Sequence, residues 1–246
     1  MRSNAFKEAR IGLLVLSLVL AFVLLFYFFA SMFTSMGYKK LRDSDPASAD
    51  NISSITIIID AGHGGEDPGA VVGEMLEKEI NLYVAFALNV LFENSGYSTV
   101  MTRCDDVLLY NHGEENKKKY HDLRNREAIA DKYEDALFIS LHMNKYPLET
   151  CNGLQVFYSS NNVLSKSFAE SVQLSAKHLQ PNNHRIAKQE NENIYLLKSI
   201  DIPAILVECG FLSNPEENAL LKTNEYRTAL ALSIYCGAVE QLENLK

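Results

Sequence analysis

Short, almost wholly apolar runs recur along this 246-residue chain, and segments with helical periodicity separate most of them. The runs 136-ALFISLH-142 and 203-PAILVE-208 are apolar at nearly every position, as is typical of strands covered on both faces. Alternation of such strands with helices favours parallel pairing. We therefore predict an α/β fold, in which a single domain contains a mainly parallel twisted sheet with helices on both faces. Further strands are expected at 55–60, 97–103 and 153–158, and helices at 77–94, 121–133, 162–180 and 224–243.

The N-terminal part differs in composition from the rest. Residues 11–33 contain no charged side chain, and these 23 residues form enough helix to cross a hydrocarbon core of about 30 Å. We therefore predict a membrane anchor with a transmembrane helix in residues 1–36, a linker in 37–54 and a folded domain in 55–246. A cleaved signal peptide is the alternative, but the A-x-A sequence at 47–49 lies well past the apolar run. Basic residues flank both ends of the run equally, so they leave its orientation open.

Charge and cysteine content exclude some classes of protein. The 23 Lys and Arg residues against 31 Asp and Glu residues give a net charge of −8, and no basic run is long enough to follow a phosphate backbone. We therefore expect no nucleic acid partner. The four cysteines form no CxxC pattern, which indicates neither a cysteine zinc site nor a disulfide framework. We interpret them as buried free thiols: Cys104, Cys151, Cys209 and Cys236.

Three polar residues stand at the carboxyl ends of predicted strands. His63 lies in the glycine-rich loop after the first strand, while His142 and Glu208 end two later strands. Because these strand ends meet at one edge of an open α/β sheet, where ligand crevices form, we expect the three side chains to converge. Glu77 reaches the same region from the start of the helix at 77–94. Two imidazoles and a carboxylate form the ligand set of a catalytic zinc site, with a fourth position left for water.

Each candidate ligand also has a structural interpretation. His63 is compatible with a turn and His142 with a hydrogen-bonded core histidine, although the four glycines near His63 indicate a backbone that bends tightly. Glu77 on its own fits the first turn of a helix, where the helix dipole favours acidic residues. Glu74 and Glu79 lie close enough to compete with it.

Glu208 is better explained by function than by structure. It directly follows a buried apolar strand, where an unpaired carboxylate is costly or takes up a proton. The remaining histidines fall in polar loops or in a helix, and we interpret them as surface residues: His112, His121, His178 and His184.

Four ordered segments resemble the zinc-dependent N-acetylmuramoyl-L-alanine amidases of the Amidase_3 family: 58-IIDAGHGGEDPGA-70, 77-EKEINL-82, 137-LFISLHMN-144 and 205-ILVECGFLSN-214. The resemblance covers nearly all of residues 55–242 and implies that the domain is catalytic. It implies one Zn²⁺ per chain held by His63, Glu77 and His142, with Glu208 as the catalytic carboxylate. It also favours Glu77 over its acidic neighbours, because the residues that follow it match those after the family's ligand glutamate.

A narrower resemblance is to the branch of this family that acts on the spore cortex of endospore-forming bacteria. It rests on the N-terminal apolar run, on 122-DLRNREAIAD-131 and on 194-IYLLKSIDIPAILVECGFLSNPEE-217. It implies removal of stem peptides from muramic acid, the step before muramic-δ-lactam formation. The implied enzyme is anchored in the membrane, with its catalytic domain outside the cytoplasm at the developing spore and peptidoglycan as its substrate. The sequence leaves open whether an accessory protein is needed.

The chain departs from the family pattern at two positions. Met143 stands where a small residue is common, and Cys209 stands where Pro or Val is common. We expect both residues to lie close enough to the pocket to alter it. The connection from His142 to Gly153 is too short for the long blocking helix that some division amidases insert there.

The implied reaction is hydrolysis of the amide between the muramic lactyl group and L-alanine. Zinc lowers the pKa of its water toward about 7 and polarises the carbonyl, while Glu208 takes the proton of the water and passes it to the leaving amine. Two alternatives are a zinc peptidase that cleaves within the stem peptide and a non-catalytic wall-binding module. The absence of a GxSxG motif disfavours serine hydrolysis.

Overall fold

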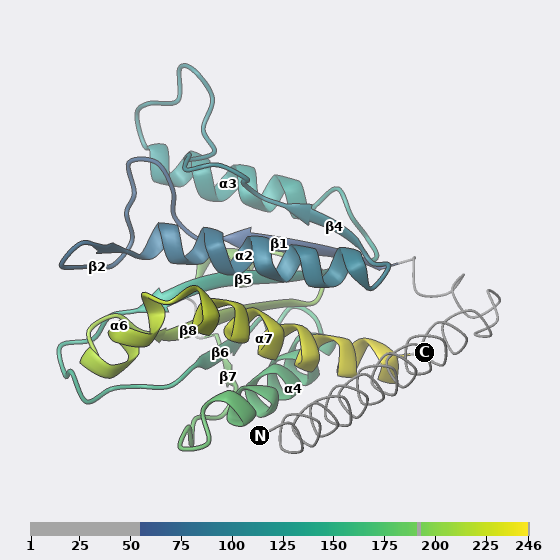
Figure 1. The fold of residues 1–246 in the computed structure, drawn as a ribbon. Helices are drawn as coiled ribbons and strands as arrows, with labels where there is room; N and C mark the ends of the chain where they lie inside the picture. Colours follow the sequence, from purple (N-terminus) through teal and green to yellow (C-terminus); the bar gives the residue numbers. More distant parts are fainter. Residues whose placement is uncertain (1–54, 191–192, 246) are drawn as a thin grey trace, which may run out of the picture. The chain divides into compact units, whose positions relative to one another are not determined.

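A six-stranded sheet forms the centre of the domain. The computed structural model describes residues 55–190 and 193–245. Within these ranges the main sheet has the order β4-β1-β5-β8-β6-β7, and β2 pairs with β3 in a separate hairpin (Figure 1). The strands are β1 (Thr56–Ala61), β2 (Val71–Val72), β3 (Met75–Leu76), β4 (Ser98–Met101), β5 (Ala136–Asn144), β6 (Gln155–Tyr158), β7 (Lys188–Gln189) and β8 (Ala204–Phe211).

The sheet is mainly parallel, as predicted, but it is mixed. Strands β4, β1, β5 and β8 pair in parallel, whereas β6 runs antiparallel to β8. The chain leaves β5 at the carboxyl edge and turns back through residues 145–154 without a crossover helix. A parallel return would need a crossover of a dozen or more residues, so this short loop reverses the strand.

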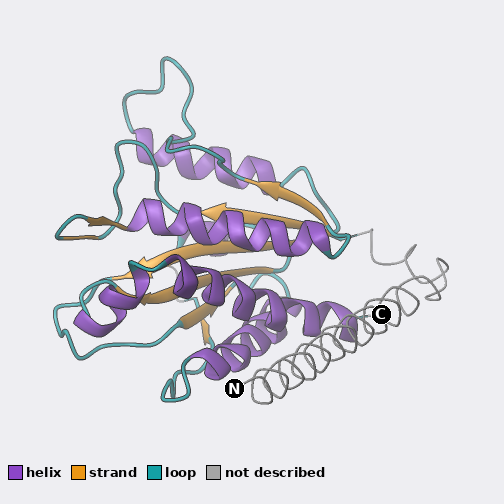
Figure 2. Cartoon of the chain, viewed as in Figure 1, coloured by secondary structure: helices purple, strands orange, loops and turns teal. Residues whose placement is uncertain are grey.

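Helices cover both faces of the sheet, as the apolar strands predicted (Figure 2). One core cluster joins alternate residues of β1, β5 and β8 to α2, α4 and α7, and a second joins the other strand faces to α3 and α5. The helices are α2 (Glu77–Asn94), α3 (Lys118–Ala130), α4 (Leu164–Leu179), α5 (Tyr195–Ser199), α6 (Pro215–Leu221) and α7 (Asn224–Asn244). The prediction missed β2, β3, β7, α5 and α6, which are too short to show a clear period.

The predicted anchor and linker lie outside the described residues. Within the described ranges, no helix combines the length and the apolarity needed to cross a membrane. The interpretation of the cysteines was wrong for most of them. Only Cys209 is buried, because Cys104 stands in the loop after β4, Cys151 lies half-buried in the loop before β6, and Cys236 faces solvent from α7.

A buried ion pair joins α3 to the sheet. Arg126 of α3 places Nη1 2.6 Å from Oδ1 of Asp60 on β1, and its Nε lies 3.0 Å from Oδ2 of Asp122. Asp60 also accepts hydrogen bonds from the hydroxyls of Thr102 (2.7 Å) and Ser140 (2.6 Å). Burial would raise the pKa of Asp60, but Arg126 and the two hydroxyls outweigh it and hold the pKa below its ordinary value. The carboxylate therefore stays charged and ties β1, β5 and α3 together.

We expect Arg126→Met to lower the free energy of unfolding by about 3–5 kcal/mol, because it leaves Asp60 and Asp122 buried without their cation. Arg124 on the same helix is a matched control, since its ion pair with Glu127 is exposed on the arginine side. Arg124→Met should change stability little. Urea unfolding of both variants tests this, and equal losses would show that the buried pair has no special role.

Candidate metal centre and catalytic residues

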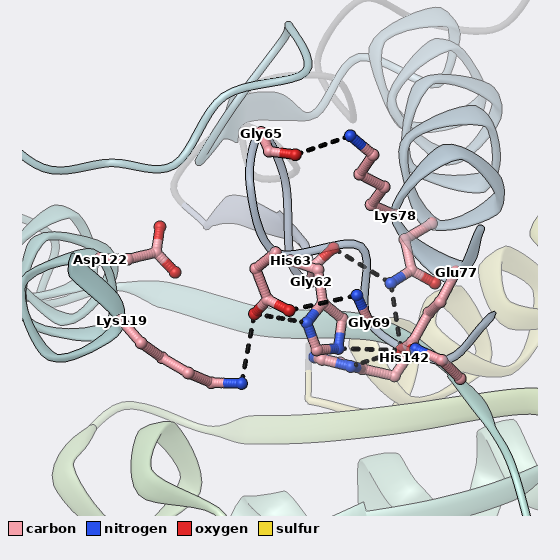
Figure 3. Close-up of polar contacts among 12 residues, drawn as sticks. Gly62, His63, Gly65, Gly69, Glu77, Lys78, Lys119, Asp122 and His142 are labelled. Carbon is pink, nitrogen blue, oxygen red and sulfur yellow. Dashed lines mark hydrogen bonds and ion pairs between the residues drawn. The ribbon is translucent and has the colours of Figure 1, made fainter. Parts of the chain in front are cut away.

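The structure brings three of the predicted site residues together at the carboxyl edge of the sheet. The ligand atoms offered by His63, Glu77 and His142 all lie within 4.8 Å of one another. His63 Nε2 lies 3.2 Å and His142 Nδ1 2.9 Å from Oε1 of Glu77 (Figure 3). The two imidazole rings meet edge to face, with centroids 4.9 Å apart. The loop after β1, the start of α2 and the end of β5 each supply one of these side chains.

Glycines leave the space that these side chains occupy. A Cβ at Gly62 would stand 2.3 Å from Nε2 of His142, and one at Gly69 would stand 2.5 Å from Oε2 of Glu77. His63 itself has a φ of 62°, a left-handed conformation that is uncommon outside glycine. Such backbone conformations persist only where surrounding contacts enforce them, and they concentrate at functional sites.

Three buried side chains enforce the backbone around His63. Arg126 donates to the carbonyl oxygens of Ala61 and His63, both at 2.8 Å. Arg103 donates to the carbonyls of Ala61 (2.8 Å) and Gly62 (3.1 Å). Asn81 of α2 also donates to the carbonyl of Gly62, at 3.1 Å. The sequence does not single out these three residues for this role, because their partners in the loop are backbone atoms that leave no pattern in the sequence.

Asp67 is a further residue that the sequence analysis did not find. Its Oδ2 lies 2.8 Å from Nδ1 of His63 and 3.2 Å from Nζ of Lys119. A carboxylate at Nδ1 favours the tautomer with the proton on that nitrogen, which leaves Nε2 free to bind a metal. Asp67 follows His63 by four positions within the glycine-rich loop, a spacing that could have suggested this contact.

Glu77 is the buried carboxylate at the centre of the cluster. Its Oε2 accepts from the Ala70 amide (2.7 Å) and its Oε1 from the Met143 amide (3.0 Å). Burial raises the pKa of Glu77, but hydrogen bonds and charge interactions with His142 and His63 outweigh it and place the pKa far below its ordinary value. The two competing residues, Glu74 and Glu79, are exposed and do not join the cluster.

The donor set fits a zinc ion. Two imidazole nitrogens and one carboxylate oxygen are the ligands of many catalytic zinc sites, and they leave one position open. In a tetrahedral site with bonds of about 2.0–2.1 Å, neighbouring ligand atoms stand roughly 3.3 Å apart. The distances of 2.9 Å and 3.2 Å from Glu77 Oε1 to the two imidazole nitrogens are close to that spacing. Small adjustments would therefore suffice to accept the ion.

Glu208 lies on β8 directly beside His142, its Cα partner on β5. Its Oε2 is shielded from solvent and has no hydrogen-bond partner among the described residues. Burial raises the pKa of Glu208 to about 7, against the opposing effect of His142. A carboxyl group with a pKa near neutrality, next to a potential metal site, is suited to accept and return a proton.

The two departures from the family pattern do not point into the site. Met143 and Cys209 are both buried in the core cluster formed with α2, α4 and α7, on the sheet face opposite to His142 and Glu208. Their side chains therefore do not line the site, because adjacent strand residues face opposite ways. Both residues nevertheless lie close to it, as expected: the Met143 amide donates to Oε1 of Glu77, and burial together with Glu208 and Glu77 raises the pKa of the Cys209 thiol. The other histidines lie apart from the cluster on exposed or half-buried positions: His112, His121, His178 and His184.

Comparisons with known proteins identify the family of this chain. The sequence profile described as N-acetylmuramoyl-L-alanine amidase matches residues 57–240. The germination-specific N-acetylmuramoyl-L-alanine amidase of Bacillus subtilis is 35% identical over 224 residues, which cover 90% of this chain and 92% of that protein.

Two solved structures also resemble the chain. The CwlD amidase from Clostridioides difficile, in complex with the GerS lipoprotein, matches with a TM-score of 0.74 and 38% identity, over 77% of this chain and 99% of that one. The catalytic domain of CwlV, an N-acetylmuramoyl-L-alanine amidase from Bacillus (Paenibacillus) polymyxa, matches with a TM-score of 0.66 and 27% identity, over 77% and 98% of the two chains. Profile, sequence and structure agree, and the chain belongs to the N-acetylmuramoyl-L-alanine amidase family.

Proposed function

We propose that this protein hydrolyses the amide between the lactyl group of N-acetylmuramic acid and L-alanine in the peptidoglycan of the spore cortex, before muramic-δ-lactam is formed. The observation that carries the proposal is the cluster of His63, Glu77 and His142 beside Glu208, whose buried Oε2 has no hydrogen-bond partner among the described residues. Membership of the family supports the bond that is cleaved. Similarity to a germination-specific amidase and to CwlD supports the spore as the setting.

The residues of the chain have separate tasks in this reaction. His63, Glu77 and His142 would hold one zinc ion, which would supply Lewis acidity to make water nucleophilic near neutral pH and to polarise the amide carbonyl. Asp67 holds the proton on Nδ1 of His63 and so keeps Nε2 available. Glu208 in its carboxylate form accepts a proton from the attacking water, and as a carboxylic acid it returns that proton to the nitrogen of L-alanine as the amide bond breaks.

We also propose that residues 1–36 anchor the protein in the membrane and that the catalytic domain lies outside the cytoplasm, at the developing spore. The uncharged run at 11–33 supports the anchor, and the location of peptidoglycan supports the orientation. The C. difficile CwlD structure is a complex with the GerS lipoprotein, which supports an accessory partner of this kind for the present chain.

The metal assignment predicts which substitutions remove zinc. The purified full-length chain should hold about one Zn²⁺, and His63→Ala, His142→Ala and Glu77→Ala should each lose most of it, because three ligands are the minimum for a catalytic site. Glu74→Ala and Glu79→Ala are matched controls on the exposed side of the same segment and should retain it. Elemental analysis after dialysis measures the ratio. Full zinc content in a folded His63→Ala or His142→Ala variant would contradict the assignment.

Glu208→Gln should keep zinc and fold but lose activity on purified cortex peptidoglycan. The amide preserves size and cannot accept a proton, and a positioned acid–base group contributes about 10²–10⁴ in rate, or roughly 3–5 kcal/mol of barrier. Loss of zinc together with activity would instead make Glu208 a fourth ligand.

Mass spectrometry of the digested muropeptides gives the readout for this variant and for the parent. The parent should release peptides with free L-alanine amino termini and leave glycan without peptide. Fragments that keep L-alanine on muramic acid would identify a peptidase that cleaves within the stem.

The proposed topology predicts that a protease added to spheroplasts digests the catalytic domain. Immunoblotting with an antibody against the domain measures its loss, and a cytoplasmic protein in the same sample should survive as the control. If the domain survives alongside that control and is cleaved only after detergent lysis, the extracytoplasmic placement is wrong.

A further inference from the structure

Arg185 carries hydrogen-bond donors that the fold does not use. Its guanidinium lies over the ring of Phe211, with Cζ 4.8 Å from the centroid, and its Nε donates to the carbonyl of Asn152 at 2.8 Å. Within residues 55–190 and 193–245, no hydrogen bond involves its Nη1 or Nη2. The side chain is thus anchored at one nitrogen and stacked on a ring, while the outer part of the guanidinium fork remains open.

Strand pairing places this guanidinium next to the catalytic edge. Glu208 has Gln155 of β6 as its Cα partner, and Nε2 of Gln155 donates to the carbonyl of Ile186 at 2.6 Å. The register shift between β5 and β8 makes Phe211 the partner of Asn144, so that Phe211 shares the sheet face of Glu208. Arg185 therefore borders the site on the β6 side of Glu208, whereas β1 and α2 supply His63 and Glu77 on the other side.

The loop that carries Arg185 is held in place before any ligand binds. Asn183 is buried, and its side chain donates to the carbonyl of Leu154 at 2.8 Å and accepts from the Arg185 amide at 3.0 Å. Gly153 leaves room for it, because a Cβ there would stand 2.9 Å from Cγ of Asn183. A side chain fixed in this way loses little conformational freedom on binding.

Other cations around the site already have partners. Nζ of Lys78 lies 2.6 Å from Asp106, and Nζ of Lys119 lies 3.2 Å from Asp67. Nζ of Lys145 donates to the carbonyl of Val71 at 2.9 Å.

The nearby carboxylate of Glu217 does not neutralise Arg185 through a direct bond. It accepts instead from the backbone amides of Gly153 (3.0 Å) and Phe211 (2.7 Å). A ligand with a negative charge therefore complements the positive charge and the N–H donors of Arg185.

We propose that Arg185 binds a carboxylate of the stem peptide and makes the enzyme prefer anionic stems. The inference rests on the proposed function, in which the stem peptide is the leaving group and therefore extends away from the bond next to Glu208. A stem peptide that is not crosslinked through its last residue has a carboxylate at its own carboxyl terminus. A planar guanidinium with two nitrogens that no described residue occupies can bind a carboxylate through paired charge-assisted hydrogen bonds, which makes Arg185 a specificity residue outside the reacting centre.

The test compares two substrates and uses the zinc-loaded full-length chain. One substrate is a soluble muramyl peptide with free stem carboxylates, and the other is the same compound with those carboxylates converted to amides. Arg185→Gln should raise KM for the acid substrate about 10- to 100-fold, the range for a charge-assisted hydrogen bond, with kcat within about twofold. On the amide substrate, the variant and the parent should have the same kcat/KM. Arg185→Lys keeps the positive charge but lacks the paired donors of the guanidinium. Its KM for the acid substrate should therefore fall between those of the parent and Arg185→Gln.

Arg227 provides a matched control. Its guanidinium also lies over an aromatic ring, with Cζ 5.5 Å from the centroid of Tyr83, and its Nε donates to the carbonyl of Leu221. Arg227 differs in position, because α7 packs on the sheet face opposite to Glu208. Arg227→Gln should leave the ratio of the two KM values unchanged.

Four results would overturn the inference. An equal rise in KM on both substrates would assign Arg185 a packing role, and unchanged KM values in a folded Arg185→Gln variant would exclude carboxylate binding. If Arg185→Gln does not fold, the test uses Arg185→Lys, and KM values equal to those of the parent would also exclude carboxylate binding by the guanidinium. A parent that releases no L-alanine amino termini from either substrate contradicts the proposed function and this inference together, whereas an active parent isolates the failure at Arg185.

Discussion

The ion pair between Asp60 and Arg126 fixes the position of the loop that carries His63 at the end of β1. Arg126 neutralises a carboxylate that burial alone would make unstable, and the same guanidinium donates to the carbonyls on either side of Gly62. Arg126 thus contributes both to the packing of α3 and to the backbone around His63, which Arg103 and Asn81 also support. Because an arginine fork has fixed geometry, it can hold several acceptors in place at once, which a lysine at this position would not do.

Two carboxyl groups at the same edge of the sheet have opposite electrostatic environments. Burial would raise the pKa of Glu77, but its contacts with His142 and His63 outweigh burial and lower the pKa, so Glu77 stays charged. Oε2 of Glu208 is shielded and has no hydrogen-bond partner within residues 55–190 and 193–245, and burial raises the pKa of this carboxyl group to about 7. Pairs of groups whose pKa values are pushed apart in this way often have separate roles. Here the charged carboxylate of Glu77 is suited to bind a cation, and the carboxyl group of Glu208, with its raised pKa, is suited to proton transfer.

The antiparallel strand β6 adds its first residues to the sheet edge that holds His142 and Glu208. Its first residue lies beside Glu208, and the loop that precedes β7 docks onto it through Gln155 and Asn183. This arrangement brings Arg185 to the edge that already holds His63 and His142. A fully parallel sheet would have placed the start of β6 at the far end of the domain.

The sequence by itself determined the strand and helix layers, because apolar runs are local patterns. Glycines and polar residues at element ends also made His63, Glu77, His142 and Glu208 candidate site residues, with Glu74 and Glu79 as competitors of Glu77. The family resemblance separated Glu77 from its neighbours, and burial in the structure separates them as well. Only the tertiary structure decided which residues support these four. Asp60 and Arg126 are 66 positions apart. The arginines that hold the loop around His63 bind backbone carbonyl oxygens, which every residue has and which therefore give no sequence signal. The direction of β6 and the inward side chains of Met143 and Cys209 likewise depend on pairing between distant segments, which hydrophobic periodicity alone does not encode.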